Sequence, residues 1–181
     1  VGNSAVRAST LQALLAGQSG MVPGTALSPV SDEQEEARRL RHDAAHFAGR
    51  MGYDAGFLQV ADVPLPGIPA SLGLAAPDDA TPDRPNELRY QHFSVLYSAP
   101  KKGPVLGALN IDGSQTRALK RRNTTWTKDL RLPVAIQLDA RDYGDPEIDR
   151  GHLVRRAATN WGESDAVAKQ ADADSFHYTV C

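Results

Sequence analysis

The sequence contains very little cysteine, few aromatic residues and no long apolar run. Its single cysteine, Cys181, excludes an internal disulfide bond and any zinc site built from several cysteines. No apolar stretch approaches the roughly 20 residues that a membrane-spanning helix needs. The first thirty residues also lack the basic start and sustained apolar core of a signal peptide. We therefore expect neither a membrane partner nor a signal peptide.

The composition that remains is typical of a soluble globular protein. Hydrophobic residues make up 41% and charged residues 23% of the 181 positions, which argues against wholesale disorder. The length suits one domain, or one domain with an arm. Because the sequence begins at Val1 instead of Met and ends on a cysteine, we expect it to be a fragment.

Charge is distributed unevenly along the chain, although the formal net charge is only −2. Residues 1–86 carry six basic and ten acidic side chains, whereas residues 87–181 carry fourteen and twelve. The most basic stretch sets six cations against Asp129: Arg117, Lys120, Arg121, Arg122, Lys128 and Arg131. Such a stretch is typical either of a phosphate-binding patch or of a solvated loop, and charge alone favours the loop.

The N-terminal half divides into an arm and a proline-rich segment. In the arm, residues 1–51, a helix is predicted over 31–51 from the capping box of Ser31 and Gln34 and an apolar stripe at helical spacing. Residues 52–86 contain six prolines, which excludes a long helix or a central strand. We expect this second segment to be extended and to wrap over the surface.

The third part, residues 87–181, predicts a sheet followed by short helices. Aromatic and β-branched residues around a Lys-Lys-Gly-Pro turn predict two partner strands. The predicted elements are strands at Tyr90–Ser98 and Val105–Asp112, an extended segment at Val134–Asp139, a helix near Ala166–Ala171, and a strand or helix start at Phe176–Val180. The predicted class is α+β, with an antiparallel sheet and flanking helices.

The segment Asp149-Arg150-Gly151-His152-Leu153 carries the strongest chemical signal. A histidine can act as a general base near neutral pH. An arginine guanidinium fits a pair of phosphate oxygens, and a neighbouring carboxylate can orient either group. The segment therefore suggests phosphodiester chemistry, and a polar turn with a hydrogen-bonded histidine is the alternative.

The same segment resembles the signature of the DNA/RNA non-specific endonucleases, the ββα-metal nucleases that include mitochondrial endonuclease G. Residues 50–181 resemble bacterial members of that family. Beyond the signature, the segments that carry the resemblance are Gly52-Tyr53-Asp54, Phe57-Leu58, Pro64-Leu65-Pro66, Arg89–Val95, Asn110–Gly113, Trp126 with Asp129 and Pro133, Trp161-Gly162, and Asp174–Thr179. The resemblance implies a six-stranded antiparallel sheet with flanking helices, of which residues 87–181 are the N-terminal half.

The resemblance also implies an activity, the cleavage of DNA and RNA with little sequence preference. It makes His152 the general base that activates water, puts Arg150 near the scissile phosphate, and has Asp149 orient the arginine or the loop. One Mg²⁺ ion, or Mn²⁺ or Ca²⁺ in its place, is expected to bind the scissile phosphate. The candidate phosphate-binding residues are Arg117, Lys120, Arg121 and Arg122, and one of the last two is the candidate for a transition-state contact.

The sequence departs from the family where the metal is held. In the family, the metal-ligand asparagine follows a T-N-x-x-P-Q segment well downstream of the catalytic histidine, and this sequence stops at Cys181 before that point. No metal ligand is assigned, and the asparagine is expected beyond Cys181. We expect the isolated chain to be inactive and to need a C-terminal half, as a separate or missing segment. The alternative is a nucleic-acid-binding or regulatory fragment.

For the location of the protein, the bacterial cytoplasm is favoured over secretion. A homodimer is an open alternative to a monomer.

The other histidines and the tryptophans are expected to be structural. His42 and His46 have a spacing that can bind a metal, but no third ligand is near in the sequence, so surface positions on the predicted helix are favoured. His92 is predicted to pack in the sheet, and His177 to be structural. Both tryptophans, Trp126 and Trp161, are more typical of core anchors than of base-stacking platforms.

Overall fold

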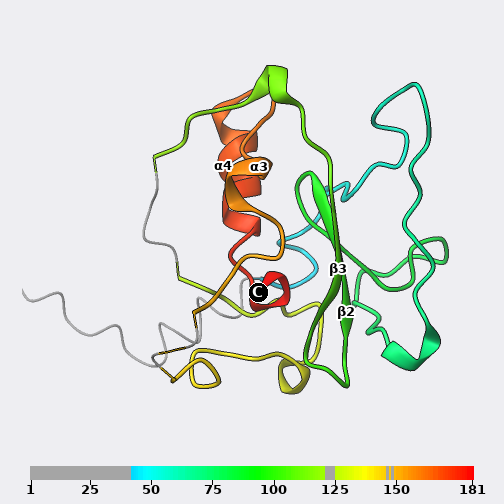
Figure 1. The fold of residues 1–181 in the computed structure, drawn as a ribbon, viewed down its shortest axis with the longest axis vertical. Helices are drawn as coiled ribbons and strands as arrows, with labels where there is room; N and C mark the ends of the chain where they lie inside the picture. Colours follow the sequence, from blue (N-terminus) through cyan, green and yellow to red (C-terminus); the bar gives the residue numbers. More distant parts are fainter. Residues whose placement is uncertain (1–41, 121–124, 146, 148) are drawn as a thin grey trace, which may run out of the picture. The chain divides into compact units, whose positions relative to one another are not determined.

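The computed structural model describes residues 42–120, 125–145, 147 and 149–181 (Figure 1). At its centre lies a three-stranded antiparallel sheet in the order β1-β2-β3. The strands are β1 (Glu87–Arg89), β2 (Phe93–Ser98) and β3 (Gly103–Leu109). Val95 of β2 pairs with Leu88 on one side and with Gly107 on the other. This sheet and its flanking helices confirm the predicted α+β class.

The strand boundaries differ from those predicted, because turns interrupt the apolar pattern. The predicted strand Tyr90–Ser98 is broken where the Tyr90 amide donates to the Phe93 carbonyl at 2.9 Å and His92 has a φ of 73°. The next strand ends at Leu109 instead of Asp112. The Asp112 side chain accepts from the Ser114 amide and so caps the 3-10 turn η2 (Gly113–Gln115).

Strand β2 is buried along its whole length, and its two faces have different neighbours. Alternate residues Phe93, Val95 and Tyr97 belong to the hydrophobic core. On the other face, the Ser94 hydroxyl accepts from the Tyr53 amide at 2.7 Å, and the Ser98 hydroxyl donates to the Leu72 carbonyl. The proline-rich segment thus supplies the partners for the second face of the sheet.

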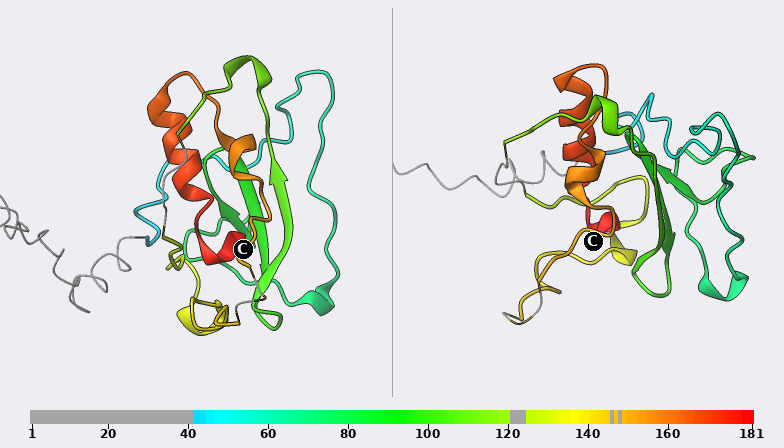
Figure 2. Two further views of the ribbon diagram at one scale, coloured as in Figure 1. Left: turned by 60° about the vertical axis from the view of Figure 1, so that its left-hand side comes forward. Right: turned by 45° about the horizontal axis from the view of Figure 1, so that its top comes forward.

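Helices cover the first face of the sheet (Figures 1 and 2). They are α3 (Arg156–Thr159), α4 (Asp165–Asp174) and the 3-10 turn η4 (Tyr178–Val180). Helix α4 begins after Ser164, whose side chain accepts from the Val167 amide, and it confirms the helix predicted near Ala166–Ala171. The core between these layers consists of Phe47, Leu88, Tyr90, Phe93, Val95, Tyr97, Leu132, Val154 and Val180.

Two local predictions are wrong within the described residues. The first part of the helix predicted over 31–51, up to residue 41, lies outside the described residues. In the rest, residues 44–49 form turns instead of a helix, closed by bonds such as the one from the His46 amide to the Asp43 carbonyl at 3.1 Å. The extended segment predicted at Val134–Asp139 begins with a 3-10 turn, η3 (Val134–Ile136), directly after Pro133.

The proline-rich segment 52–86 contains the short 3-10 turn η1 (Ala70–Leu72) and isolated bridges in place of long elements. In the part of the chain that is described, no helix combines the length and the apolar character needed to cross a bilayer.

Candidate active site

His152 is a half-buried residue whose imidazole ring packs against two aromatic side chains. The ring centroid lies 4.6 Å from that of Trp126 and 4.7 Å from that of Phe176, to which it is perpendicular. Trp126 and Phe176 also contact each other, with centroids 5.5 Å apart. Packing on two sides restricts the orientation of the imidazole, which is the condition for directing one ring nitrogen at a reacting atom.

The two aromatic residues come from distant segments that the backbone lays side by side. The Thr127 amide donates to the Phe176 carbonyl at 3.0 Å, and the Tyr178 amide donates to the Thr127 carbonyl at 2.9 Å. These bonds form a parallel bridge between Thr127 and His177. The residues that precede the bridge partners are Trp126 and Phe176, and this is why both side chains reach His152.

The segment that carries His152 is attached to the fold on its C-terminal side. The Leu153 amide donates to the Val180 carbonyl in η4 at 2.8 Å, and Val154 is a core residue. Strand β3 permits this approach, because a Cβ atom at Gly107 would lie 2.9 Å from Val154 Cγ2 and 3.2 Å from Leu153 Cδ2. Glycine at this position lets the His152 segment lie directly on the sheet.

The two residues predicted to act with His152 are exposed. The Arg150 guanidinium lies 3.5 Å from the buried Tyr178 hydroxyl, at the long limit of a hydrogen bond. Among the described residues no ion pair joins Asp149 to Arg150, so the predicted orienting role of Asp149 stays a prediction. The guanidinium of Arg150 therefore faces solvent beside the half-buried histidine segment, where an anionic ligand could reach it.

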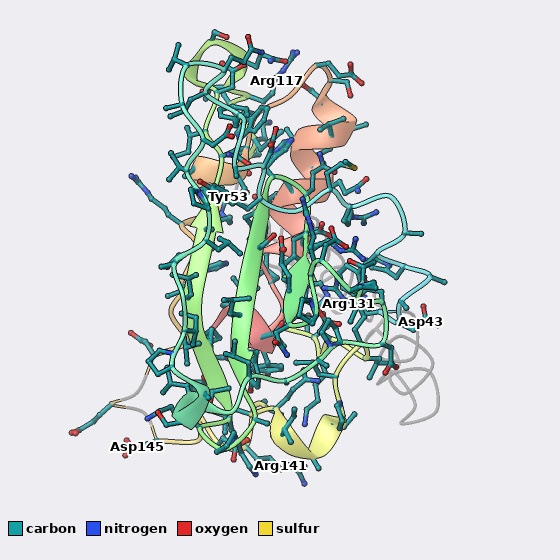
Figure 3. The ribbon with its side chains drawn as sticks, turned by 90° about the vertical axis from the view of Figure 1, so that its right-hand side faces the viewer. Asp43, Tyr53, Arg117, Arg131, Arg141 and Asp145 are labelled. Atoms are coloured by element: carbon teal, nitrogen blue, oxygen red, sulfur yellow. The ribbon has the colours of Figure 1, made fainter. Side chains whose placement is uncertain are left out.

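The basic stretch does not form one surface patch. Arg131 is fully buried, and the Lys128 ammonium lies 3.2 Å from Asp139 Oδ2. Arg117 donates to the carbonyls of Gly162 and Glu163 at 3.0 and 2.8 Å, so it holds the loop before α4. Figure 3 shows Arg117 at the end of the sheet opposite Arg141 and Asp145.

The remaining candidate phosphate ligands divide between described and undescribed positions. Lys120 is exposed, whereas Arg121 and Arg122 lie outside the described residues. Phosphate contacts by these side chains stay predictions.

A cluster of three histidines was missed by the sequence patterns. His42 Nδ1 lies 2.9 Å from Nε2 of the buried His177, whose Nδ1 lies 2.8 Å from the Asp174 carbonyl oxygen. The His46 ring stacks obliquely on His42 at 4.3 Å. The prediction of surface positions on a helix is therefore wrong for His42 and His46, which are both partly buried. No local signal points to this cluster, since 135 residues separate His42 from His177.

Burial lowers the pKa values of all three histidines, and repulsion from neighbouring histidines lowers those of His42 and His46 further. The pKa of His42 falls from 6.5 to about 4, through burial first and then through the neighbouring His177 and His46. The pKa values of His46 and His177 are also lowered, in each case chiefly by burial. The cluster is therefore built to hold neutral imidazoles.

The described residues do not fit a metal ion on their own. These residues contain no group of three or more His, Cys, Asp or Glu side chains placed to hold a metal ion. A ligand asparagine beyond Cys181 stays a prediction.

This chain is similar to a known protein and to one protein family. The uncharacterized protein y4fB of Sinorhizobium fredii (strain NBRC 101917 / NGR234) is 41% identical over 171 residues, which cover 89% of this chain and 26% of that protein. The chain thus spans about a quarter of the length of this relative. No solved structure matches it. A family model for the DNA/RNA non-specific endonucleases matches residues 71–181, which include the whole His152 segment and its aromatic neighbours. The chain therefore belongs to the DNA/RNA non-specific endonuclease family.

Proposed function

We propose that this chain carries the histidine side of the active site of a metal-dependent endonuclease that hydrolyses phosphodiester bonds of DNA and RNA without sequence preference. The observation that carries the proposal is the half-buried imidazole of His152, held between Trp126 and Phe176 two residues after an exposed arginine. Family membership supplies the reaction class.

In this proposal, His152 accepts a proton from the water molecule whose oxygen attacks phosphorus. The bond between phosphorus and the 3′ oxygen breaks, and the leaving 3′ oxygen takes a proton from solvent. A general base needs a fixed orientation and a neutral ring, and the two aromatic contacts provide the first of these. General-base catalysis typically contributes about 10²–10⁴-fold to the rate. The proton then passes from the imidazole to solvent.

Arg150 binds the phosphate in this proposal. Its guanidinium is exposed, and its contact with the Tyr178 hydroxyl is long enough to be exchanged for a charge-assisted bond to a phosphate oxygen. Asp149 precedes it and is also exposed, so it could pair with Arg150 once the loop contacts substrate. Lys120, Arg121 and Arg122 extend the phosphate contacts along the nucleic-acid backbone, and Arg117 is the fourth candidate.

Mg²⁺ dependence belongs to the proposal as a property of the family. In this proposal the metal is held by the asparagine that the resemblance to the family implies, which is expected beyond Cys181. The partners of the complete protein are then DNA, RNA and this further segment.

The test is cleavage of plasmid DNA and of RNA by a longer protein that continues beyond Cys181. We expect His152→Ala to lower the cleavage rate by roughly 10²–10⁴-fold. Arg141→Gln, a change at a side chain that is 90% exposed, serves as the control and should cleave as the unmodified protein does. Near-normal cleavage by a folded His152→Ala protein would falsify the general-base assignment. A protein that binds nucleic acid without cutting it in either form would instead be the regulatory alternative.

A further inference from the structure

A buried polar network lies next to the candidate site and is not used by the proposed reaction. Tyr90, Asp129, Arg131 and Thr179 each have a fully buried side chain. The Arg131 guanidinium pairs with both carboxylate oxygens of Asp129, at 3.1 and 2.7 Å, and lies over the Phe47 ring at 3.7 Å. Polar groups this deeply buried destabilise a fold unless each finds a partner, so their presence calls for a reason.

The Tyr90 hydroxyl joins two of these groups. Its oxygen lies 2.6 Å from Asp129 Oδ2 and 2.6 Å from Thr179 Oγ1. An ionised carboxylate only accepts hydrogen bonds and a phenol has one proton, so Tyr90 donates to Asp129 and Thr179 donates to Tyr90. Burial and the Asp129 charge raise the pKa of Tyr90 well above its usual range, which keeps the phenol protonated. Both bonds are therefore directional and satisfied.

The two residues joined by Tyr90 occupy equivalent positions in the two segments that hold His152. Asp129 follows Trp126 by three positions, and Thr179 follows Phe176 by three. The segments are already aligned once by the parallel bridge between Thr127 and His177. The hydrogen bonds of the Tyr90 hydroxyl connect the two segments a second time, farther along the chain. Two connections fix the register of the segments, whereas a single connection would let them pivot.

We propose that Tyr90 is a positioning residue for His152. Its hydroxyl clamps Asp129 to Thr179, so the segments 126–129 and 176–179 keep the register that places Trp126 and Phe176 against the imidazole. The orientation of the ring follows from the geometry alone, and its catalytic consequence rests on the proposed function. The same clamp reaches the backbone of the His152 segment, because Val180, next to Thr179, accepts from the Leu153 amide.

The test uses Tyr90→Phe in the 181-residue chain, observed through the NMR resonances of the His152 ring. Those resonances are displaced by the ring currents of Trp126 and Phe176, so they report the geometry directly and need no nuclease activity. Tyr97→Phe is the matched control, because Tyr97 is equally buried and donates to the Ile136 carbonyl at 2.9 Å, away from the clamp. We expect Tyr90→Phe to shift the His152 resonances and Tyr97→Phe to leave them in place.

A second pair of variants covers the case in which Tyr90→Phe does not fold. Thr179→Val removes the hydroxyl and keeps the branched shape, whereas Thr179→Ser keeps the hydroxyl. We expect a His152 shift in the first and an unchanged spectrum in the second. Unmoved His152 resonances in folded Thr179→Val, or equal shifts in Tyr90→Phe and Tyr97→Phe, would overturn the proposal. If the His152→Ala variant of the nuclease still cuts nucleic acid, the proposed function is overturned. That result would not change the NMR evidence on the positioning role of Tyr90.

Discussion

Arg131 and Asp129 form an ion pair from which solvent is completely excluded, although the same Asp-x-Arg spacing recurs at the surface. In the buried pair, Nη2 of Arg131 lies 2.7 Å from Asp129 Oδ2, and both side chains are 0% exposed. In the surface pair, Nη2 of Arg141 lies 3.1 Å from Asp139 Oδ2, and the Arg141 side chain is 90% exposed. Burial is the largest single influence on the pKa of Asp129 and raises it, but the Arg131 charge and the hydrogen bonds from Arg131 and Tyr90 together hold the pKa below its ordinary value.

These two pairs give a matched prediction for stability. We expect Arg131→Gln to lower the free energy of unfolding by about 3–5 kcal/mol, because it leaves the Asp129 carboxylate buried and unpaired. Arg141→Gln should cause no measurable change, since the Arg141 side chain is 90% exposed and Asp139 keeps Lys128 as a partner. Urea unfolding of both variants at neutral pH measures the difference. Equal effects would show that burial of the first pair does not matter to stability.

The histidine cluster predicts that the fold is sensitive to acid. Between pH 6.5 and about 4, an unfolded chain takes up protons at His42, while the folded chain keeps this ring neutral. The unfolded state then binds more protons, so stability falls as the pH is lowered through this window and is fully present above it. His46 and His177 add to the effect in the same direction.

The charges that face the cluster act in both directions without cancelling this trend. Asp129 and Asp174 favour the protonated histidines, whereas Arg50 and Arg131 oppose them. We expect the melting temperature to fall by several degrees between pH 7 and pH 5. In His42→Gln, whose amide can still donate to His177, the fall should be smaller. The same pH dependence in that variant would contradict a role of the cluster.

Gly107 gives a prediction about the attachment of the His152 segment. In Gly107→Ala the new methyl group overlaps Val154 and Leu153, and we expect a loss of roughly 1–3 kcal/mol of stability from overpacking. Gly113→Ala is the control, because a Cβ atom there meets no atom within 4 Å. Urea unfolding of the two variants makes the comparison. If both substitutions are tolerated equally, the His152 segment is not packed tightly against β3.

The last prediction concerns the chain by itself. We expect residues 1–181 alone to show no Mg²⁺-dependent cleavage of plasmid DNA, because His152 cannot by itself neutralise the charge that develops on the phosphate. Adding a segment that continues beyond Cys181 should restore cleavage, and the His152→Ala version of the same mixture is the control. Cleavage by the isolated chain that depends on Mg²⁺ and on His152 would locate the ligands within this sequence.

Local patterns in the sequence were sufficient to predict the family, the α+β class and helix α4. Short-range physical rules act there: the Ser164 side chain caps the helix within one turn, and the apolar residues Phe93, Val95 and Tyr97 alternate along strand β2. The Asp149–Leu153 segment is recognisable for the same reason, since its chemistry lies in consecutive residues.

The surroundings of His152 were decided by the tertiary structure. Trp126 and Phe176 meet only because a bridge joins Thr127 to His177, and the pairing of His42 with His177 spans 135 residues. The sequence pattern places Arg131 in a basic stretch with five other cations, whereas the fold buries its side chain against Asp129 and two aromatic rings. Charge and spacing say nothing about such contacts, because solvent exclusion and long-range register arise only when the segments pack together.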